Sequence, residues 1–275
     1  MKILSLFDGI SAGQLALRQA NKTIDQYYAS EVDKYAIQLT QRNFPNPIQL
    51  GDVNNWREWD IPWAEIDLVM GGSPCQGFSF AGKQLNFDDP RSALFFVFVD
   101  VCHHVANHNP KMRFLLENVR MKKESQAVIT GYMGVEPIPI NSSLVSAQNR
   151  YRLYWTNIPN VTQPDDQGII LRDILETNGN ALVNPIDERM VTSDGKSYCL
   201  TARYDGAVAW NSIERKQRSM VAVDPKNFRK LTPVECERLQ TFPDHFTEGV
   251  SKTQRYKALG NSWTVSVITH IFKNL

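Results

Sequence analysis

A row of polar residues, each placed where a short apolar segment ends, constrains the fold of this chain more than any other feature. Through the first 155 residues, short apolar segments alternate with longer amphipathic stretches, which is typical of parallel strands joined by crossover helices. The residues at the ends of the expected strands are Asp8, Glu31, Asp52, Cys75 and Glu117. Because ligands bind at the carboxyl ends of the strands in an open α/β sheet, these side chains together predict one crevice, although each alone would be read as a helix cap or a loop charge.

The same pattern predicts an α/β domain with a mostly parallel sheet, and a second, smaller lobe. The expected strands cover residues 2–7, 27–30, 48–50, 66–70 and 113–116. The expected helices cover residues 14–19, 34–43, 232–240 and 262–275, with Asp33 and Thr232 as N-terminal caps of the second and third. From residue 157 the pattern loosens into segments rich in Pro, Gly, Asn and Asp. The predicted division is therefore 1–156 with 229–275 for the main domain, and 157–228 for the small lobe.

Composition excludes several other classes of protein. The chain has 275 residues, 42% of them hydrophobic and 21% charged, which is enough to bury a core. Its four cysteines form no CxxC pair, and no apolar run reaches the roughly 18 residues of a membrane span. We therefore expect no disulfide framework, no metal site and no membrane segment, and a cytoplasmic protein. The formal net charge is only +1, but basic residues outnumber acidic ones after residue 100, which favours a C-terminal lobe that binds a polyanion.

The turn after the first expected strand predicts a nucleoside site. It contains Gly9 and Gly13, without the GxGxxG spacing that cradles a pyrophosphate. Glu31, at the end of the next strand, is placed where a carboxylate binds the hydroxyl groups of a ribose. S-adenosylmethionine is a cofactor that meets this description.

Cys75 lies on the turn that leaves a strand, within Gly72-Ser73-Pro74-Cys75-Gln76. A lone cysteine is usually a small core residue, but the flanking Gly, Ser and Pro indicate a shaped loop. Backbone amides on such a turn favour the thiolate. With Glu117 at the end of a neighbouring strand, the chain has a nucleophile and a separate proton donor, as covalent catalysis requires.

Five motifs, in this order along the chain, resemble those of the DNA (cytosine-5) methyltransferase family. They are Phe7-Asp8-Gly9, Gly71-Gly72-Ser73-Pro74-Cys75-Gln76, Glu117-Asn118-Val119, Gln148-Asn149-Arg150-Tyr151-Arg152 and Gly260-Asn261-Ser262. The resemblance implies a Rossmann-like S-adenosylmethionine-dependent methyltransferase domain with a mostly parallel sheet and a small irregular target-recognition lobe. The segment from Gln76 to Arg91 resembles that of enzymes from bacterial restriction-modification systems.

The family resemblance implies a covalent mechanism on a cytosine flipped out of duplex DNA. Cys75 would add to C6 of the base, and Glu117 would contact N3, after which the methyl group moves to C5. Arg150 and Arg152, expected on one face of a strand, would hold the base carbonyl and the nearby backbone. Asn118 and Pro74 would shape the pocket.

The resemblance also assigns residues to the cofactor and to DNA. In the cofactor site, Glu31 would bind the ribose, Asp52 the adenine amino group, and Val32 would flank the adenine. The full cofactor set is Phe7, Asp8, Gly9, Ile10, Ser11, Glu31, Val32, Asp52, Val53, Leu94, Asn261, Ser262 and Trp263. The DNA-binding set is Gln76, Ser79, Lys83, Arg91, Arg203, Tyr204, Lys216 and Arg218. Residues 200–206 form the candidate recognition loop.

Three alternatives stay open from the sequence. The first is a tRNA cytosine-5 methyltransferase of the same fold, and the second a catalytically silent nucleic-acid-binding module. The third is a cysteine hydrolase, which would need a histidine base such as His103, His104 or His108. The expected partners are double-stranded DNA and, in a restriction-modification system, a cognate restriction endonuclease, with the chain acting as a monomer.

Overall fold

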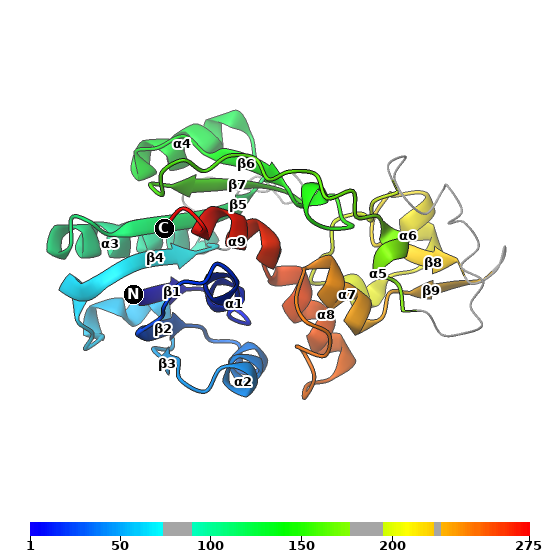
Figure 1. The fold of residues 1–275 in the computed structure, drawn as a ribbon, viewed down its shortest axis with the longest axis horizontal. Helices are drawn as coiled ribbons and strands as arrows, with labels where there is room; N and C mark the ends of the chain where they lie inside the picture. Colours follow the sequence, from blue (N-terminus) through cyan, green and yellow to red (C-terminus); the bar gives the residue numbers. More distant parts are fainter. Residues whose placement is uncertain (74–89, 177–194, 223–226) are drawn as a thin grey trace. The chain divides into compact units, whose positions relative to one another are not determined.

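The structure is a computed structural model that describes residues 1–73, 90–176, 195–222 and 227–275 (Figure 1). Of the predicted site residues, Pro74, Cys75, Gln76, Ser79 and Lys83 lie outside these ranges, as does the side chain of Arg91.

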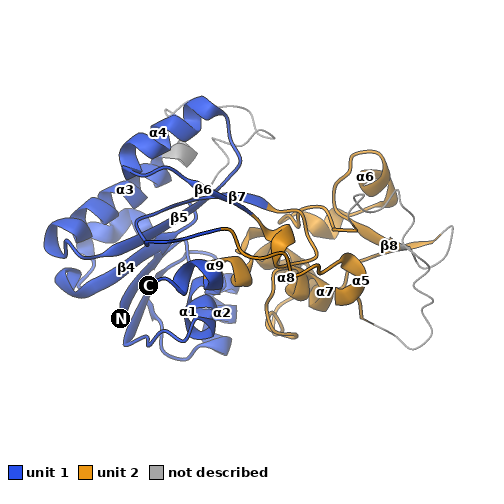
Figure 2. Ribbon diagram, turned by 45° about the horizontal axis from the view of Figure 1, so that its top comes forward, with its two compact units in different colours: residues 1–140, 151–162, 269–275 blue, residues 141–150, 163–268 orange. Residues whose placement is uncertain are grey.

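The chain divides into two compact units (Figure 2). Unit 1 comprises residues 1–140, 151–162 and 269–275, and unit 2 comprises residues 141–150 and 163–268. Unit 2 thus contains most of the small lobe predicted at 157–228, together with the segment that follows it. The assignment of chemistry and target recognition to separate parts of the chain remains a prediction.

The sheet of unit 1 has the strand order β3-β2-β1-β4-β5-β7-β6 among the described residues. The pairs β1–β2, β2–β3, β1–β4 and β4–β5 are parallel, and β7 is antiparallel to β5. The strands are β1 (Lys2–Leu6), β2 (Gln26–Ser30), β3 (Ile48–Gln49), β4 (Ile66–Gly71), β5 (Arg113–Val119), β6 (Ile138–Asn141) and β7 (Tyr151–Thr156). The mostly parallel α/β sheet predicted from the sequence is confirmed, with each expected strand present.

Helices connect these strands as the crossover pattern requires. The elements of this part of the chain are α1 (Ala12–Gln19), α2 (Lys34–Asn43), η1 (Val53–Glu58), η2 (Trp63–Glu65), α3 (Pro90–His108), α4 (Lys123–Met133) and α9 (Val265–Phe272). Asp33 caps α2 as expected, because its side chain accepts a hydrogen bond from the Tyr35 amide at 2.9 Å. The single helix expected over 262–275 was wrong in extent, since α9 begins only at Val265.

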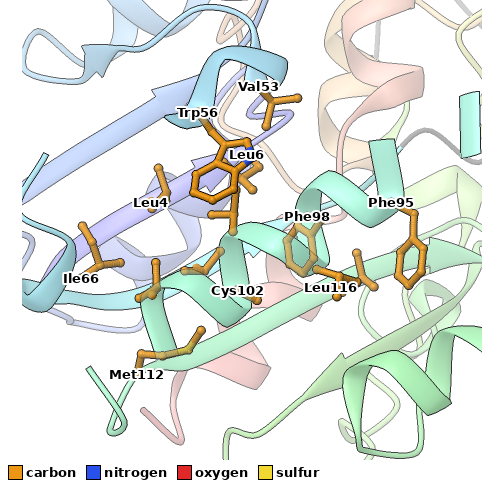
Figure 3. Packing of buried hydrophobic residues seen from close by; sticks show 14 of the residues in the cluster. Leu4, Leu6, Val53, Trp56, Ile66, Phe95, Phe98, Cys102, Met112 and Leu116 are labelled. Carbon is orange, nitrogen blue, oxygen red and sulfur yellow. The ribbon is translucent and has the colours of Figure 1, made fainter. Parts of the chain in front are cut away.

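An apolar core joins α3 to the strands, as Figure 3 shows for Phe98 and Cys102 of the helix and for Leu4, Leu6 and Leu116 of the sheet. Where β1 and β4 end, Leu6 is paired with Gly71. A Cβ on Gly71 would lie 2.7 Å from the Leu6 carbonyl oxygen and 3.1 Å from the Phe98 ring. The two strand ends therefore approach each other at a distance that only glycine allows.

Unit 2 combines short helices with a two-stranded ribbon. Its elements are η3 (Ser142–Leu144), α5 (Leu171–Ile174), η4 (Tyr204–Gly206), α6 (Ala209–Ile213), β8 (Met220–Ala222), β9 (Phe228–Lys230), α7 (Pro233–Leu239) and α8 (Lys252–Asn261). The capping box expected at the start of α7 is confirmed: the Glu235 amide donates to Thr232 Oγ1 at 3.1 Å, and the Thr232 amide donates to Glu235 Oε2 at 2.8 Å.

The two fully buried carboxylates in the described part of unit 2 are paired with arginines. Glu235 also binds both terminal nitrogens of Arg229, each at 2.7 Å, and is fully buried. Glu237, equally buried, accepts from the Thr247 amide at 2.8 Å and from Arg255 Nη2 at 2.9 Å. None of the helices in the described ranges is both long and apolar enough to cross a membrane.

Candidate active site and cofactor site

The predicted polar row lies at one edge of the sheet of unit 1. Asp8 follows β1, Glu31 follows β2, and Asp52 comes shortly after β3. Ser73, the last described residue before Cys75, follows β4, and Glu117 is part of β5 near its end. Because these strands are parallel, the residues gather at the carboxyl edge where ligands bind in such sheets.

Glu31 organises the turn after β1. Its Oε2 accepts a hydrogen bond from the Gly9 amide, and its Oε1 accepts from the amides of Val32 and Asp33, all at 2.8 Å. The carboxylate thus holds the loop of Gly9 against the start of the segment after β2. Beside it, the side chain of Val32 is 70% exposed, an apolar surface at the predicted place of the adenine.

Asp8 binds hydroxyl groups of its own unit through its carboxylate. It accepts a short hydrogen bond from Ser11 and one from the Tyr27 hydroxyl at 2.6 Å. Thr40 Oγ1 in turn bonds Ser11 Oγ at 3.2 Å. Burial raises the pKa of Asp8 to about 6, although the hydrogen bonds that it accepts oppose this shift.

The Asp8 network stabilises a backbone that is otherwise unfavourable. Phe7 and Ser11 both have φ near 56°, in the left-handed region that non-glycine residues rarely adopt. Ser11 is the residue before α1, and its side chain makes no capping bond to that helix. The side-chain bonds to Asp8 and Thr40 therefore hold the turn that the resemblance assigns to the cofactor.

The remaining cofactor candidates of unit 1 differ in their bonds and in their burial. Asp52 caps η1 and accepts from the backbone amide of Asn54 at 2.9 Å and from its side-chain amide at 2.8 Å. Val53 and Ile10 are buried, and Leu94 is half-buried. The contact of Asp52 with an adenine remains a prediction.

Glu117 is paired with Arg152 in unit 1. The Glu117 Oε1 atom lies 2.8 Å from Arg152 Nε, and the two side chains are 12% and 14% exposed. Asn118 is buried, donates to Ser73 Oγ at 3.3 Å and accepts from the Val119 amide at 2.8 Å. These contacts link the end of β5 to the start of the segment that carries Cys75.

Arg150 occupies a different environment from Arg152, contrary to the expectation that both share one strand face. It precedes β7 and belongs to unit 2, where its guanidinium donates to the Leu200 and Ser262 carbonyls, each at 2.8 Å. It also donates to the Gly260 carbonyl at 3.3 Å. These bonds give Arg150 a structural role within unit 2, while its contact with the base remains a prediction.

Gln148, for which the sequence suggested no role, supports the same loops of unit 2. Its side-chain amide donates to the Leu239 carbonyl at 2.7 Å, and its Oε1 accepts from the Leu200 amide at 3.1 Å. Its place in the motif with Arg150 and Arg152 was the signal that marked it.

Three predicted cofactor residues come directly after Gly260 in the sequence, in unit 2: Asn261, Ser262 and Trp263. Ser262 is buried, whereas Asn261 is exposed and Trp263 half-buried. A Cβ on Gly260 would lie 2.1 Å from the carbonyl carbon of Thr201, so this position permits no side chain. The role of these residues at the cofactor remains a prediction.

The predicted DNA-binding residues of unit 2 differ in exposure. Arg203 and Lys216 are exposed, whereas Arg218 is half-buried and donates from Nη1 to the Gly206 carbonyl at 2.9 Å. Tyr204 is only 1% exposed, and its hydroxyl donates to the Ser219 carbonyl at 2.6 Å and accepts from the Leu231 amide at 2.8 Å. The contacts of Tyr204 anchor the loop from within, and burial raises the pKa of its hydroxyl.

The histidines of α3 are placed among aromatic side chains. The His104 ring lies 4.7 Å from the Trp63 ring and 5.1 Å from the Trp56 ring, and burial lowers its pKa. Within the described ranges, no group of three metal-binding side chains occurs.

Comparisons with known proteins agree with the sequence motifs. A family model for C-5 cytosine-specific DNA methylases matches residues 1–129 and 148–275. The type II methyltransferase M1.ScrFI of Lactococcus lactis subsp. cremoris is 31% identical over all of this chain and 77% of its own length. The type II methyltransferase M.NlaX of Neisseria lactamica is also 31% identical, over all of this chain and 96% of its own.

Solved structures of methyltransferases have the same fold. The Entamoeba histolytica methyltransferase EhMeth matches all of this chain and 97% of its own length, with a TM-score of 0.73 and 17% identity. The S. pombe Dnmt2 methyltransferase matches 99% of this chain and 97% of its own, with a TM-score of 0.72 and 20% identity.

Proposed function

The chain belongs to the C-5 cytosine-specific DNA methylase family and is an S-adenosylmethionine-dependent DNA cytosine-5 methyltransferase, and we propose how its own residues carry out that reaction. The observation that carries the proposal is the joined arrangement of Glu117, Arg152, Asn118 and Ser73 at the carboxyl edge of the sheet. It lies where a nucleophile on the turn after β4 would meet a base.

The residues that follow β1, β2 and β3 at the carboxyl edge of the sheet fit a nucleoside cofactor. Glu31 supplies a carboxylate, Val32 an exposed apolar side chain, and Gly9 a turn whose amide is already bonded to Glu31. S-adenosylmethionine, when bound, supplies the methyl group on a positively charged sulfur. We assign Glu31 to the ribose hydroxyls, Val32 to the adenine face and Asp52 to the adenine amino group.

Cys75 is the proposed nucleophile, and it adds to C6 of a cytosine that has left the base stack. Flipping costs a few kcal/mol, which protein contacts must offset. Glu117 bonds N3 and so selects cytosine by its Watson–Crick edge. Arg152, held against Glu117, orients that carboxylate and contributes donors to the base carbonyl.

Transfer of labelled methyl groups to duplex DNA tests the mechanism. Cys75→Ser should abolish transfer, because a serine alkoxide is not accessible near neutral pH, while binding of the cofactor persists. Cys102→Ala is the matched control, since Cys102 is buried in α3 and burial raises the pKa of its thiol. A duplex with 5-fluorocytosine at the target should trap the wild-type protein covalently, because fluorine cannot leave as a cation. Transfer by Cys75→Ser would exclude the covalent route, and transfer to tRNA in preference to DNA would favour the tRNA alternative.

We further propose that residues 157–228 select the DNA sequence. The exposed side chains of Arg203 and Lys216 support this assignment. Arg203→Ala should relax the preference at one position and cost about 1 to 3 kcal/mol if the side chain bonds a base edge. Methylation profiling on a random-sequence DNA library measures the effect, and an unchanged sequence preference at wild-type rate would place the recognition elsewhere.

The biological setting proposed for the enzyme is a restriction-modification system in the cytoplasm, with the enzyme acting as a monomer and a cognate endonuclease as its counterpart. Two relatives named type II methyltransferases support this setting, whereas another relative, from Bacillus phage SPR, is named an orphan methyltransferase. Bisulfite sequencing of host DNA after expression identifies the methylated site. Digestion of that DNA by an endonuclease encoded beside the gene then decides between the two settings.

A further inference from the structure

Two large apolar side chains of unit 2 are exposed within one short segment. Val208 is 53% exposed and Trp210, in α6, is 54% exposed. In the described part of unit 2, they are the exposed large hydrophobic residues. Two exposed apolar side chains are too few to mark a binding surface by themselves, so the charges beside them decide what this segment can bind.

A cation lies on the exposed indole. The guanidinium carbon of Arg215 is 4.3 Å from the centre of the Trp210 ring, the geometry of a cation–π contact. A guanidinium stacked in this way keeps the N–H groups at its rim available for two parallel hydrogen bonds to an anion.

In the part of the chain that the structure describes, four basic side chains close to Trp210 in the sequence form no ion pair, unlike several others of unit 2. Arg229, Lys230, Arg238 and Arg255 are each paired with a carboxylate. Within the described ranges, in contrast, no ion pair involves Arg203, Arg215, Lys216 or Arg218. The acidic residues of the same stretch are Asp205, which is paired with Lys230, and the exposed Glu214. The stretch therefore presents an excess of uncompensated positive charge.

Figure 2 shows α6 in unit 2, and hydrogen bonds to backbone carbonyls hold the segment around it. The Gln217 amide donates to the Asn211 carbonyl at 3.0 Å, and Arg218 donates to the Gly206 carbonyl at 2.9 Å. Ser212, in α6, is fully buried. Arg215 is consequently presented on an ordered turn, which lowers the entropy lost when it binds a partner.

We propose that Trp210 and Arg215 form a phosphate-binding contact for duplex DNA, in which the indole positions the guanidinium and the guanidinium binds the backbone. The inference rests on the proposed function of residues 157–228, and it adds a contact that the sequence motifs do not assign. Duplex DNA suits the surface because it offers a row of phosphates to the guanidinium of Arg215. A phosphate contact strengthens binding without reading a base.

The salt dependence of DNA binding tests this contact. The logarithm of the binding constant falls as the logarithm of the salt concentration rises. Arg215→Ala in the full chain should make this slope less steep by about 0.9. The gain in binding constant on a tenfold dilution of salt should then be about eightfold smaller than in wild type. The loss should be the same for every duplex sequence. Arg215→Lys should keep the slope, because the charge remains, but bind more weakly than wild type.

A double-mutant cycle separates the positioning role of Trp210 from a contact of its own. Trp210→Ala should weaken binding when Arg215 is present and have a much smaller effect in the Arg215→Ala background, whereas Trp210→Phe should rescue most of the loss. Arg57→Ala is the matched control, since Arg57 also lies over an indole, that of Trp56 at 4.4 Å, but is paired with Asp100 at 3.3 Å. Its slope should equal that of wild type.

The outcomes distinguish this inference from the proposed function. An unchanged slope in a folded Arg215→Ala protein that still methylates DNA overturns the contact and leaves the enzyme assignment intact. A change of oligomeric state without a change of slope would assign the surface to a protein partner instead. A wild-type protein that neither binds nor methylates DNA would instead contradict the proposed function.

Discussion

Glu117 and Arg152 meet across the antiparallel pairing of β5 with β7, with Oε1 of the carboxylate 2.8 Å from Nε of the guanidinium. In the strand register Arg152 is opposite Val119, so the pair spans the ladder diagonally at the end of β5. The orientation of the proposed catalytic carboxylate therefore depends on a side chain from the neighbouring strand β7.

Replacing Arg152 should impair both catalysis and stability. Arg152→Ala removes the ion-pair partner of a largely buried carboxylate, which should cost up to about 3 to 5 kcal/mol of unfolding free energy. The rate constant of methyl transfer should fall about 100-fold because Glu117 loses its orientation. Arg238→Ala is the control: Arg238 forms a more exposed pair with Asp244, which contributes at most about 1 kcal/mol. Wild-type single-turnover rates for Arg152→Ala would show that Glu117 is oriented by other groups.

Glu31→Ala should weaken binding of S-adenosylmethionine by about 1 to 3 kcal/mol, because the ribose hydroxyls lose their acceptor and the Gly9 amide loses its own. Titration calorimetry measures the effect directly. The exposed Glu124 of α4 supplies a control, and Glu124→Ala should bind as wild type does. Equal affinities of Glu31→Ala and wild type would exclude Glu31 from the cofactor site.

Asp8 should make the stability of the protein depend on pH in a defined window. Its pKa is about 6 in the folded protein against an ordinary value of 3.8, so the folded state retains a proton that the unfolded chain has released. The contribution of Asp8 to the free energy of unfolding is fully present below about pH 4 and is lost as the pH rises through about 6. The loss amounts to about 2 to 3 kcal/mol.

Comparison of wild type with Asp8→Asn isolates that contribution, since asparagine does not titrate. Urea unfolding should be measured from about pH 4 to about pH 7. As the pH rises, the free energy of unfolding of wild type should fall relative to that of Asp8→Asn. A constant difference across the window would mean that Asp8 titrates normally.

Two glycines should respond to alanine in opposite directions. Gly260→Ala places a Cβ 2.1 Å from the Thr201 carbonyl carbon and 2.2 Å from the Ala202 nitrogen, which are backbone atoms that cannot rotate away. Overpacking of this kind should cost at least about 1 to 3 kcal/mol. At Gly131, inside α4, an alanine methyl group would meet no atom of the described residues within 4 Å, so Gly131→Ala should stabilise by about 0.5 to 1 kcal/mol. Calorimetric melting temperatures that fall for both variants would contradict the contrast.

The strands of the carboxyl edge were predictable because each is a local apolar run with a polar residue at its end. Asp8, Glu31 and Glu117 needed no knowledge of distant contacts to be placed there. The orientation of β7 was not predictable in this way, because its antiparallel pairing with β5 joins segments that α4 and β6 separate in the sequence.

Site residues that depend on distant partners escaped the sequence pattern. The i, i+2 spacing of Arg150 and Arg152 predicted one strand face, but the Ser142 amide bonds the Arg150 carbonyl at 3.0 Å, and the strand begins only at Tyr151. Tyr204 was predicted to bind DNA because of its place in a polar loop. It is buried, and its hydroxyl donates to the Ser219 carbonyl and accepts from the Leu231 amide. A tyrosine that anchors a loop from within has the same local sequence as one that faces DNA.

The close approach of Gly71 to Leu6 leaves no room for a Cβ at position 71, and this affects the proposed reaction. The seam between β1 and β4 separates the strands followed by the proposed cofactor residues from those followed by the proposed base-binding residues. A side chain at position 71 would act as a wedge between the two strand ends, since its Cβ would meet the Leu6 carbonyl at 2.7 Å. Transfer between two bound molecules tolerates little extra separation, and a displacement of about 1 Å can cost about 100-fold in rate. The distance over which the methyl group must move should therefore depend on Gly71 having no side chain.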